Sequence, residues 1–100
     1  MKEMDDKAAE VAGFLKGIAN AHRLLILCQL SEGEKSVSEL IEATGIAQTS
    51  MSQHLNKLKS ERIVDFRRDH RVLYYSICSE PVHAIMAVLY EHFCKEIKDD

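Results

Sequence analysis

The spacing of apolar and polar positions predicts a chain built mainly from helices. In residues 3–17, apolar side chains recur every three or four positions behind an acidic first turn, which suits the positive end of a helix dipole. Residues 21–33 form a second segment that is apolar on more than one side, with Asn20 as a suitable N-cap and Gly33 as the expected stop. This second helix is therefore predicted to be the most buried one.

A short helix, a tight turn and a longer helix follow. Residues 36–45, SVSELIEATG, offer Ser36 or Ser38 as a cap for about two to three helical turns that end at Gly45. Residues 47–64, AQTSMSQHLNKLKSERIV, then combine an apolar stripe with an outer face of small, amide-bearing and cationic side chains. The stripe consists of Met51, Leu55, Leu58 and Ile63. Two helices joined by a glycine turn are typical of a helix-turn-helix.

The pattern changes to a period of two in residues 63–77, IVDFRRDHRVLYYSI, which predicts a β-hairpin with a polar tip at residues 67–71. Pro81 then suits the first turn of a last helix. The apolar stripe of that helix is expected to consist of Val82, Ile85, Met86, Leu89, Phe93 and Ile97. The sequence therefore predicts one domain over residues 1–100, mainly α with a small β-hairpin (α+β), in which the hairpin lies between the fourth and the fifth helix.

Charge is distributed unevenly along the chain, although the total is only −3. Residues 57–71 hold six lysines and arginines against three acidic residues, whereas residues 1–10 hold two against four. One face alone could therefore attract nucleic-acid phosphate. No apolar run approaches the roughly 18 residues of a membrane span, and the acidic start lacks the layout of a signal peptide. We accordingly expect a cytoplasmic protein with no membrane partner.

Three segments together resemble the ArsR family of dimeric bacterial repressors, over nearly the whole chain. They are LKGIANAHRLLIL, SVSELIEATGIAQTSMSQHLNKL and RRDHRVLYYSI. The resemblance implies a winged helix-turn-helix fold, a homodimer and double-stranded operator DNA as partner. Two positions depart from the family pattern, because SERIV at residues 60–64 and DHR at residues 69–71 stand where the family usually has a glycine. Both departures concern the geometry of the hairpin.

An α-helix fits the DNA major groove, so side chains near the start of the helix within residues 47–64 are expected to read base edges. The candidates are Gln48, Thr49, Ser50, Ser52 and Gln53, with His54 as a further DNA-binding candidate. Cationic side chains supply affinity through phosphate, and this role is expected of Lys57, Arg67, Arg68, His70 and Arg71. Simpler alternatives are an ordinary solvated helix face and, for each basic hairpin residue, a role in solubility alone.

The cysteines Cys28, Cys78 and Cys94 show no CxxC pairing, so a structural disulfide framework is not expected. Within the ArsR family, Cys28 in LLILCQL and Cys94 in LYEHFC resemble the paired cysteines of the sulfur-responsive BigR, SqrR and HlyU subgroup. That resemblance implies that a reactive sulfur species, a persulfide or polysulfide, links the two thiols and that the linked protein releases DNA. Cys78 matches neither place and is interpreted as a structural or bystander residue.

Other functions remain open at this point. Cys28 could be an inert core residue, since buried thiols usually are. A metal-responsive repressor is the main alternative, with ligands drawn from His83, Glu91, His92, Cys94 and Glu96 of the last helix. A thiol enzyme would need a CxxC pair or a placed base, and a protein-binding winged helix would be expected to lack the polar helix start and the basic hairpin together. We therefore expect a DNA-binding repressor, not an enzyme, with no cofactor and no bound metal.

Overall fold

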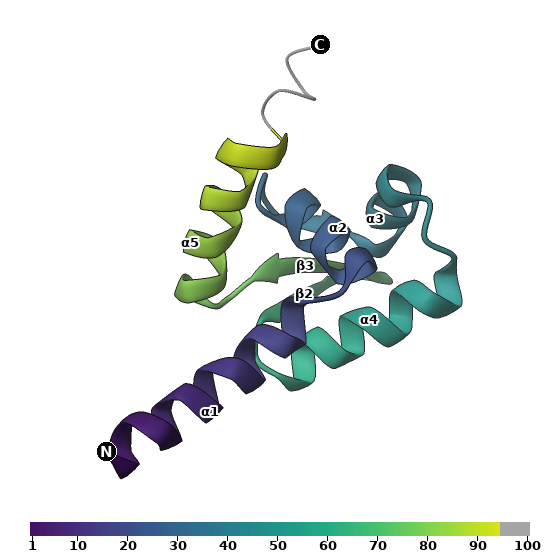
Figure 1. The fold of residues 1–100 in the computed structure, drawn as a ribbon. Helices are drawn as coiled ribbons and strands as arrows, with labels where there is room; N and C mark the ends of the chain where they lie inside the picture. Colours follow the sequence, from purple (N-terminus) through teal and green to yellow (C-terminus); the bar gives the residue numbers. More distant parts are fainter. Residues whose placement is uncertain (95–100) are drawn as a thin grey trace.

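The computed structural model describes residues 1–94, with the backbone alone at Cys94 (Figure 1). Its elements are α1 (Lys2–Ile18), α2 (Ala21–Leu30), β1 (Lys35–Ser36), α3 (Val37–Thr44), α4 (Gln48–Ser60), β2 (Val64–Asp69), β3 (Val72–Ile77), α5 (Glu80–Leu89) and the π-helical turn η1 (Tyr90–Cys94). The predicted order of helices and hairpin strands is confirmed, while β1 and η1 are additions. Within residues 1–94, no single helix is long and apolar enough to cross a membrane. The pair α1 and α2 meets the length and composition of a span only when the two helices are counted together, and a bend of 83° separates them.

Local signals set the ends of α2. The Asn20 side chain accepts a hydrogen bond from the backbone N–H of Arg23 at 3.1 Å, so Asn20 is the predicted N-cap. The helix ends at Leu30, before the predicted stop at Gly33. The N–H groups of Glu32 and Gly33 each donate to a carbonyl three residues back, so the chain tightens and leaves the α-helix before it reaches the glycine.

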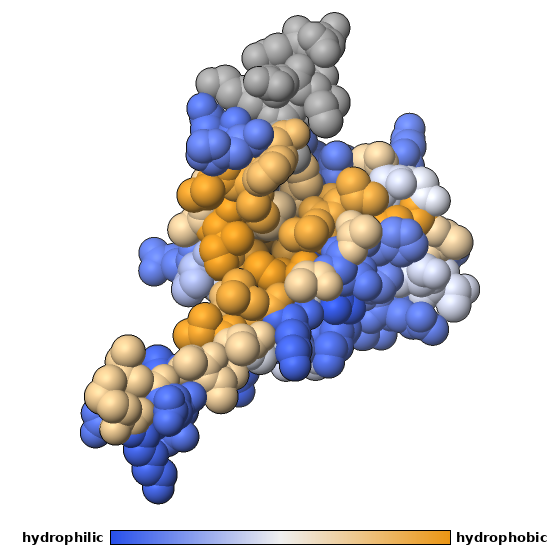
Figure 2. Space-filling model, in the orientation of Figure 1, coloured by the Kyte–Doolittle hydropathy of each residue, from blue (hydrophilic) through white to orange (hydrophobic). Residues whose placement is uncertain are grey.

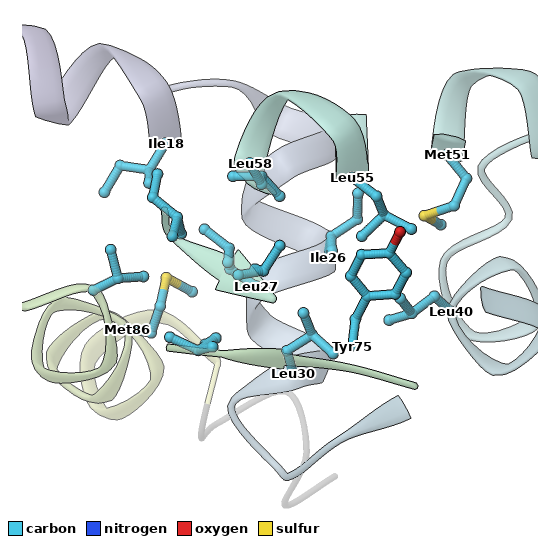
Figure 3. Packing of buried hydrophobic residues seen from close by; sticks show 14 of the residues in the cluster. Ile18, Ile26, Leu27, Leu30, Leu40, Met51, Leu55, Leu58, Tyr75 and Met86 are labelled. Carbon is cyan, nitrogen blue, oxygen red and sulfur yellow. The ribbon is translucent and has the colours of Figure 1, made fainter. Parts of the chain in front are cut away.

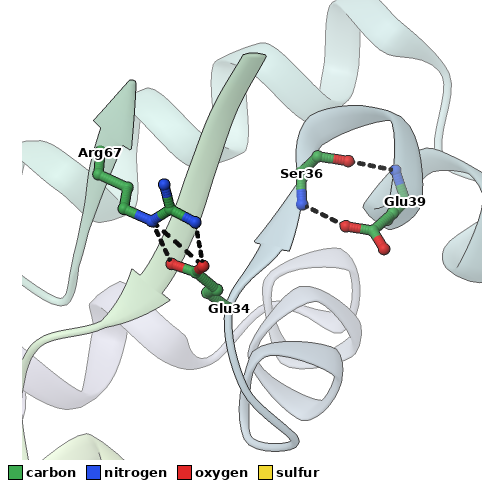
Figure 4. A network of polar contacts seen from close by, with 4 residues as sticks. All are labelled: Glu34, Ser36, Glu39 and Arg67. Atoms are coloured by element: carbon green, nitrogen blue, oxygen red, sulfur yellow. Dashed lines mark hydrogen bonds and ion pairs between the residues drawn. The ribbon is translucent and has the colours of Figure 1, made fainter. Parts of the chain in front are cut away.

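The start of α3 distinguishes between the two predicted caps. Ser36 and Glu39 form a reciprocal capping box, in which Glu39 N–H donates to Ser36 Oγ at 3.1 Å and Ser36 N–H donates to Glu39 Oε1 at 2.8 Å (Figure 4). Ser38 is exposed and lies within the helix. Gly45 ends α3 with φ 75°, a left-handed conformation that glycine adopts without strain. Ser36 is therefore the cap, and the predicted helix-turn-helix geometry is in place.

The core is centred on α2, which contacts α3, α4 and β3. Its most buried side chains converge between the helices and the sheet (Figure 3). They include Ile26, Leu27, Leu30, Leu40, Met51, Leu55 and Leu58, each exposed by 1% or less. Full burial of such side chains stabilises by roughly 1.5–3 kcal/mol each relative to exposure. The predicted stripe of α4 is thus confirmed, except that Ile63 is buried in the connection after the helix has ended at Ser60.

The hairpin differs from its predicted form. Strand pairing continues to the pair Asp69 and Val72, so Arg67 and Arg68 belong to β2, and the turn consists of His70 and Arg71 alone. The run RRDHR was therefore wrongly assigned as the tip, because exposed strand residues carry no apolar alternation. The sheet also gains a third strand, since β1 pairs with β3 in the order β1-β3-β2.

Left-handed backbone occurs at both positions where the family usually has glycine. Arg62 has φ 61° and His70 has φ 58°. A residue with a side chain is strained there by about 1–3 kcal/mol, so the surrounding pairing must impose this conformation. The hairpin geometry is therefore kept despite the two departures in sequence.

The last helix begins as predicted and ends differently. The Ser79 side chain accepts from the N–H of Val82 at 3.3 Å, and Pro81 lies in the first turn. Val82 and Met86 are buried, whereas Phe93, within η1, is 70% exposed and does not extend the buried stripe. Ile97 lies outside the described residues.

Candidate nucleic-acid interface and cysteine site

The outer face of α4 presents the predicted base-reading side chains. Gln48, Thr49, Ser52 and Gln53 are exposed, and Ser50 is half-buried. They occupy the first two turns of the helix, while Met51 and Leu55 anchor its inner face in the core. The helix can therefore approach a groove with its polar side while the opposite side holds it in position.

A groove lined by both polar and apolar side chains joins this helix to the hairpin turn. It has a volume of about 280 Å³. Its walls are formed by Ser36, Val37 and Ser38 of the α3 start, Gln48 and Ser52 of α4, and Arg71, Val72 and Leu73 of the hairpin. The structure thus brings Gln48, Ser52 and Arg71 together, two candidate base readers and one candidate phosphate contact.

The beginning of α4 is also suited to an anion. Asn20, Ser36 and Ser79 cap α2, α3 and α5 with their side chains. Ala47 is the N-cap of α4, and within residues 1–94 no side chain caps the N–H groups that follow it. Such N–H groups carry partial positive charge and readily bind phosphate.

His54 is turned away from the other DNA-binding candidates. Its ring meets the ring of His22 of α2 edge to face, with centroids 5.4 Å apart and planes at 87°. Burial, with the nearby positive charge of Arg23 and then His22, lowers the pKa of His54 from its usual value of 6.5. The side chain therefore links α4 to α2 rather than extending the outer face.

This lowered pKa makes stability depend on pH. Because the pKa of His54 is lower in the folded chain, the unfolded chain binds a proton at His54 more readily than the folded chain does. The folded state therefore has its full stability with respect to this group above pH 6.5, and it loses that contribution as the pH falls from there toward the lower folded pKa. We expect the loss of unfolding free energy between about pH 7.5 and about pH 5.5 to be smaller for His54→Gln than for the wild type, as measured by urea denaturation. His83→Gln, at an exposed position of α5, is the control and should keep the wild-type loss. Equal losses in all three proteins would contradict the assignment of this pH dependence to His54.

The candidate phosphate contacts fall into two groups. Lys57 Nζ lies 3.2 Å from Glu61 Oε1, and Arg67 is held by Glu34. Arg68 and Arg71 form no ion pair within residues 1–94, and His70 Nε2 lies 3.7 Å from Asp69 Oδ1. Arg68 and Arg71 are therefore the arginines of the hairpin most accessible to DNA.

Glu34 is a residue that the sequence did not single out. Arg67 Nε donates to both carboxylate oxygens of Glu34, at 3.1 and 3.0 Å (Figure 4). The guanidinium also lies 4.6 Å from the centroid of the Tyr74 ring. The hydrogen bond from Arg67 lowers the pKa of Glu34, and the same bond raises the pKa of Arg67. In each group the contact thus favours the charged form.

Arg23 is a second residue that sequence reasoning missed. Its Nε donates to the carbonyl of Gly17 at 2.7 Å, and a terminal nitrogen donates to the carbonyl of Lys16 at 3.4 Å. These carbonyls belong to the last turn of α1, where a cation is favourable for the helix dipole. Arg23 thereby fixes the angle between α1 and α2.

Gln53 and Arg71 are expected to contribute differently to DNA binding. Gln53→Ala should change the order of preference among operator variants, because a lost base contact costs about 1–3 kcal/mol only at the matching base pair. Arg71→Ala should weaken all sequences alike and reduce the slope of log K against log salt by about 0.9 per lost phosphate contact. Competition binding at two salt concentrations measures both effects. The same behaviour from the two variants would reject this division.

An apolar cleft of about 360 Å³ lies between α2 and α5, on the hydrophobic face seen in Figure 2. Its walls are formed by Leu24, Leu25, Cys28, Met86, Leu89 and Phe93. Cys28 is half-buried and therefore borders an accessible space rather than the sealed core. The cleft brings the predicted sensor cysteine of α2 next to the C-terminal end of α5.

Cys94 is the last residue of η1 and directly follows Phe93, which lines the cleft. A π-helix pairs residues five apart, so the backbone of Cys94 stands one π turn after Leu89. If the α-helix continued instead, the backbone of residue 94 would lie about 140° around the helix axis from that of Leu89. The π turn therefore brings the backbone of residue 94 closer to the side of Leu89. The side chain of Cys94 lies outside the described part of the structure, as does Glu96.

The remaining candidates are placed apart from this cleft. Cys78 is exposed, and its Sγ donates to the carbonyl of Arg62 at 3.4 Å, near the start of the hairpin. Among the described side chains, no three His, Cys, Asp or Glu residues lie close enough together to hold a metal ion. His83 and His92 are both exposed.

Comparison with known proteins identifies the family of the chain. Residues 20–65 match the family described as bacterial regulatory protein, arsR family. Nodulation protein NolR of Rhizobium meliloti is 41% identical over 87% of this chain and 71% of its own length. The biofilm growth-associated repressor of Xylella fastidiosa is 36% identical over 97% of this chain and 85% of its own length.

Solved structures give the same result. Reduced HlyU from Vibrio cholerae has a TM-score of 0.89 at 34% identity, covering 94% of this chain and 99% of that one. The homodimeric winged helix-turn-helix DNA-binding domain of Mb0332 from Mycobacterium bovis has a TM-score of 0.77 at 31% identity, covering 100% and 93%. The chain therefore belongs to the ArsR family of bacterial regulatory proteins and is a DNA-binding transcriptional regulator with a winged helix-turn-helix fold.

Proposed function

We propose that the protein is a homodimeric repressor that binds operator DNA in its reduced state and releases it when a reactive sulfur species links Cys28 to Cys94. The observation that carries this proposal is the apolar cleft between α2 and α5, with Cys28 in one wall and Leu89 and Phe93 in the other. Cys94 follows Phe93 at the end of the π turn. A covalent link across this cleft would join α2 to the C-terminal end of α5 and so change how the two helices pack.

The chemistry needs a persulfide or polysulfide as oxidant. The thiolate of one cysteine attacks a sulfur of the polysulfide, a sulfur–sulfur bond of the polysulfide breaks, and a thiolate leaves. The second cysteine thiolate attacks the new protein-bound sulfur and expels a second thiolate. The two protein thiols are oxidised to a bridge, and the polysulfide is reduced. An apolar cleft favours an uncharged organic polysulfide over a charged oxidant, because burying a charge in apolar surroundings costs free energy.

The homodimer is supported by an unusual amount of exposed apolar surface. Large apolar side chains that are 43–70% exposed occur on α1, α2, α5 and η1, and Figure 2 shows a broad hydrophobic surface on the face that carries α5. They are Met4, Val11, Leu15, Leu25, Val88 and Phe93. A contiguous patch of this kind marks an interface, and Mb0332, a relative of the same fold, is homodimeric. A second copy would also supply the second recognition helix that a two-fold operator requires.

The bridge itself can be tested by mass spectrometry. Reduced protein is treated separately with an organic polysulfide and with peroxide, and intact mass and peptide mapping then locate the linked cysteines. We expect polysulfide to join Cys28 to Cys94, with or without additional sulfur, and to leave Cys78 outside the bridge. Unmodified thiols at both positions would return Cys28 to the role of a packing residue. A bridge that involves Cys78 would contradict the assignment of the pair.

A further inference from the structure

The contact between Glu34 and Arg67 spans the sheet on the face opposite the core. Tyr75 and Ile77 point into the core, so their neighbour Tyr74 and its cross-strand partner Arg67 lie on the other face. Arg67 extends from β2 across the Tyr74 ring on β3 and reaches Glu34, immediately before β1. One side chain thereby connects all three strands.

In this contact the positive charge of Arg67 is already paired with the carboxylate of Glu34. The guanidinium meets the carboxylate through two of its nitrogens, in the fork geometry with which arginine also binds phosphate. A DNA phosphate would have to displace an anion that is already bound in that geometry. Arg68 and Arg71, by contrast, form no ion pair within residues 1–94 and meet DNA without such competition.

The contact also adds a restraint on the hairpin close to its turn. Glu34 is fixed by the short connection between α2 and β1, and the Arg67 side chain holds β2 to that connection. Beyond Arg67, the hairpin continues to Arg71, which borders the groove shared with Gln48 and Ser52 of α4. The wing, formed by the β2–β3 hairpin, is therefore restrained by its strand pairing and, two residue pairs before its turn, by the contact between Arg67 and Glu34.

We propose that Glu34 is a specificity-determining residue for DNA binding. By holding Arg67, it removes one sequence-independent phosphate contact from the wing and keeps the turn in place beside α4. Non-specific binding is supplied almost entirely by phosphate contacts, whereas discrimination depends on base-reading side chains in the correct register. The restraint therefore lowers affinity for arbitrary DNA more than affinity for the operator.

The test compares two duplexes over a range of salt concentrations, using the full-length reduced protein. One duplex is an operator selected with the wild-type protein from a random-sequence library, and the other is a mixed-sequence duplex of equal length. We expect Glu34→Gln to bind the mixed-sequence duplex more tightly, with a slope of log K against log salt that is steeper by about 0.9 per subunit. The ratio of operator affinity to mixed-sequence affinity should fall.

Three control variants separate release of Arg67 from a general change of charge. Arg67→Gln should keep the wild-type salt slope, because the restrained guanidinium releases no counterions. The double variant Glu34→Gln with Arg67→Gln should lose the steeper slope of Glu34→Gln. Glu42→Gln removes a negative charge from an exposed position of α3 and should leave both the slope and the ratio close to wild type.

Two outcomes would overturn the proposal. One is an unchanged salt slope for Glu34→Gln in a protein whose circular dichroism and thermal unfolding match the wild type. The other is a shallower slope for Arg67→Gln, which would mean that Arg67 already contacts phosphate in the wild-type complex. The second outcome decides the question even if Glu34→Gln folds poorly.

Discussion

Cys28→Ser and Cys94→Ser proteins are each expected to bind operator DNA as tightly as the reduced wild type and to stay bound when polysulfide is added. Serine keeps the size of cysteine but cannot form the sulfur bridge, so the proposed covalent link between α2 and α5 cannot form. For the wild type, allosteric coupling of ordinary size predicts about a 5- to 150-fold loss of affinity on treatment. Fluorescence anisotropy with a labelled operator, before and after treatment and again after a reductant, measures the loss and its reversal.

The matched control for this result is Cys78→Ser. Cys78 is exposed near the start of the hairpin, away from the α2–α5 cleft, so its variant should respond like the wild type. Release of DNA by treated Cys28→Ser and Cys94→Ser alike would mean that the response does not pass through this pair.

Val88→Glu is expected to separate the proposed homodimer and to lower operator affinity by at least about 100-fold, because simultaneous binding of two half-sites is lost. Val88 is 58% exposed, so the core of one subunit should tolerate the change, while a carboxylate buried between two apolar faces should not be tolerated. Sedimentation analysis measures the oligomeric state, and anisotropy measures the affinity.

His83→Glu provides the control for added charge on the same helix. Position 83 lies five residues before Val88, about 140° around an α-helix, and is exposed. This variant should remain dimeric and bind DNA, with only the modest loss that one more negative charge causes. A Val88→Glu protein that is folded, dimeric and fully active would place the dimer interface elsewhere.

Signals that lie close together in the sequence predicted much of the fold. The cap at Asn20, the choice of Ser36 or Ser38 followed by Gly45, and the stripe of α4 each depend on residues within a few turns of one another. These features were confirmed, with Ser36 as the cap. The strand β1 was missed because two residues are too few to show a period of two, and its pairing with β3 joins residues far apart in the chain.

The candidate site was harder to predict for the same reason. The sequence predicts Arg67 as a residue of the hairpin tip, because its partner Glu34 is 33 residues away and carries no local pattern. His54 appeared to belong to the outer face of α4, and only the packing of α2 against α4 shows that it meets His22. Cys28 resembled a core residue on an apolar helix, and the cleft beside it exists only once α5 is placed.

The π turn at the end of α5 gives the chain a length dependence that its composition does not reveal. One π turn contains one residue more than an α turn needs, so a single deletion within residues 90–93 would allow the α-helix to continue. Such a deletion would leave Val82 and Met86 in the core, and the last cysteine would then lie four residues after Leu89, about 40° around an α-helix. Loss of one residue there would thus be tolerated, because the backbone of that cysteine would stay near the side of the helix that it has one π turn after Leu89. Loss of a second residue would turn it by about a further 100°.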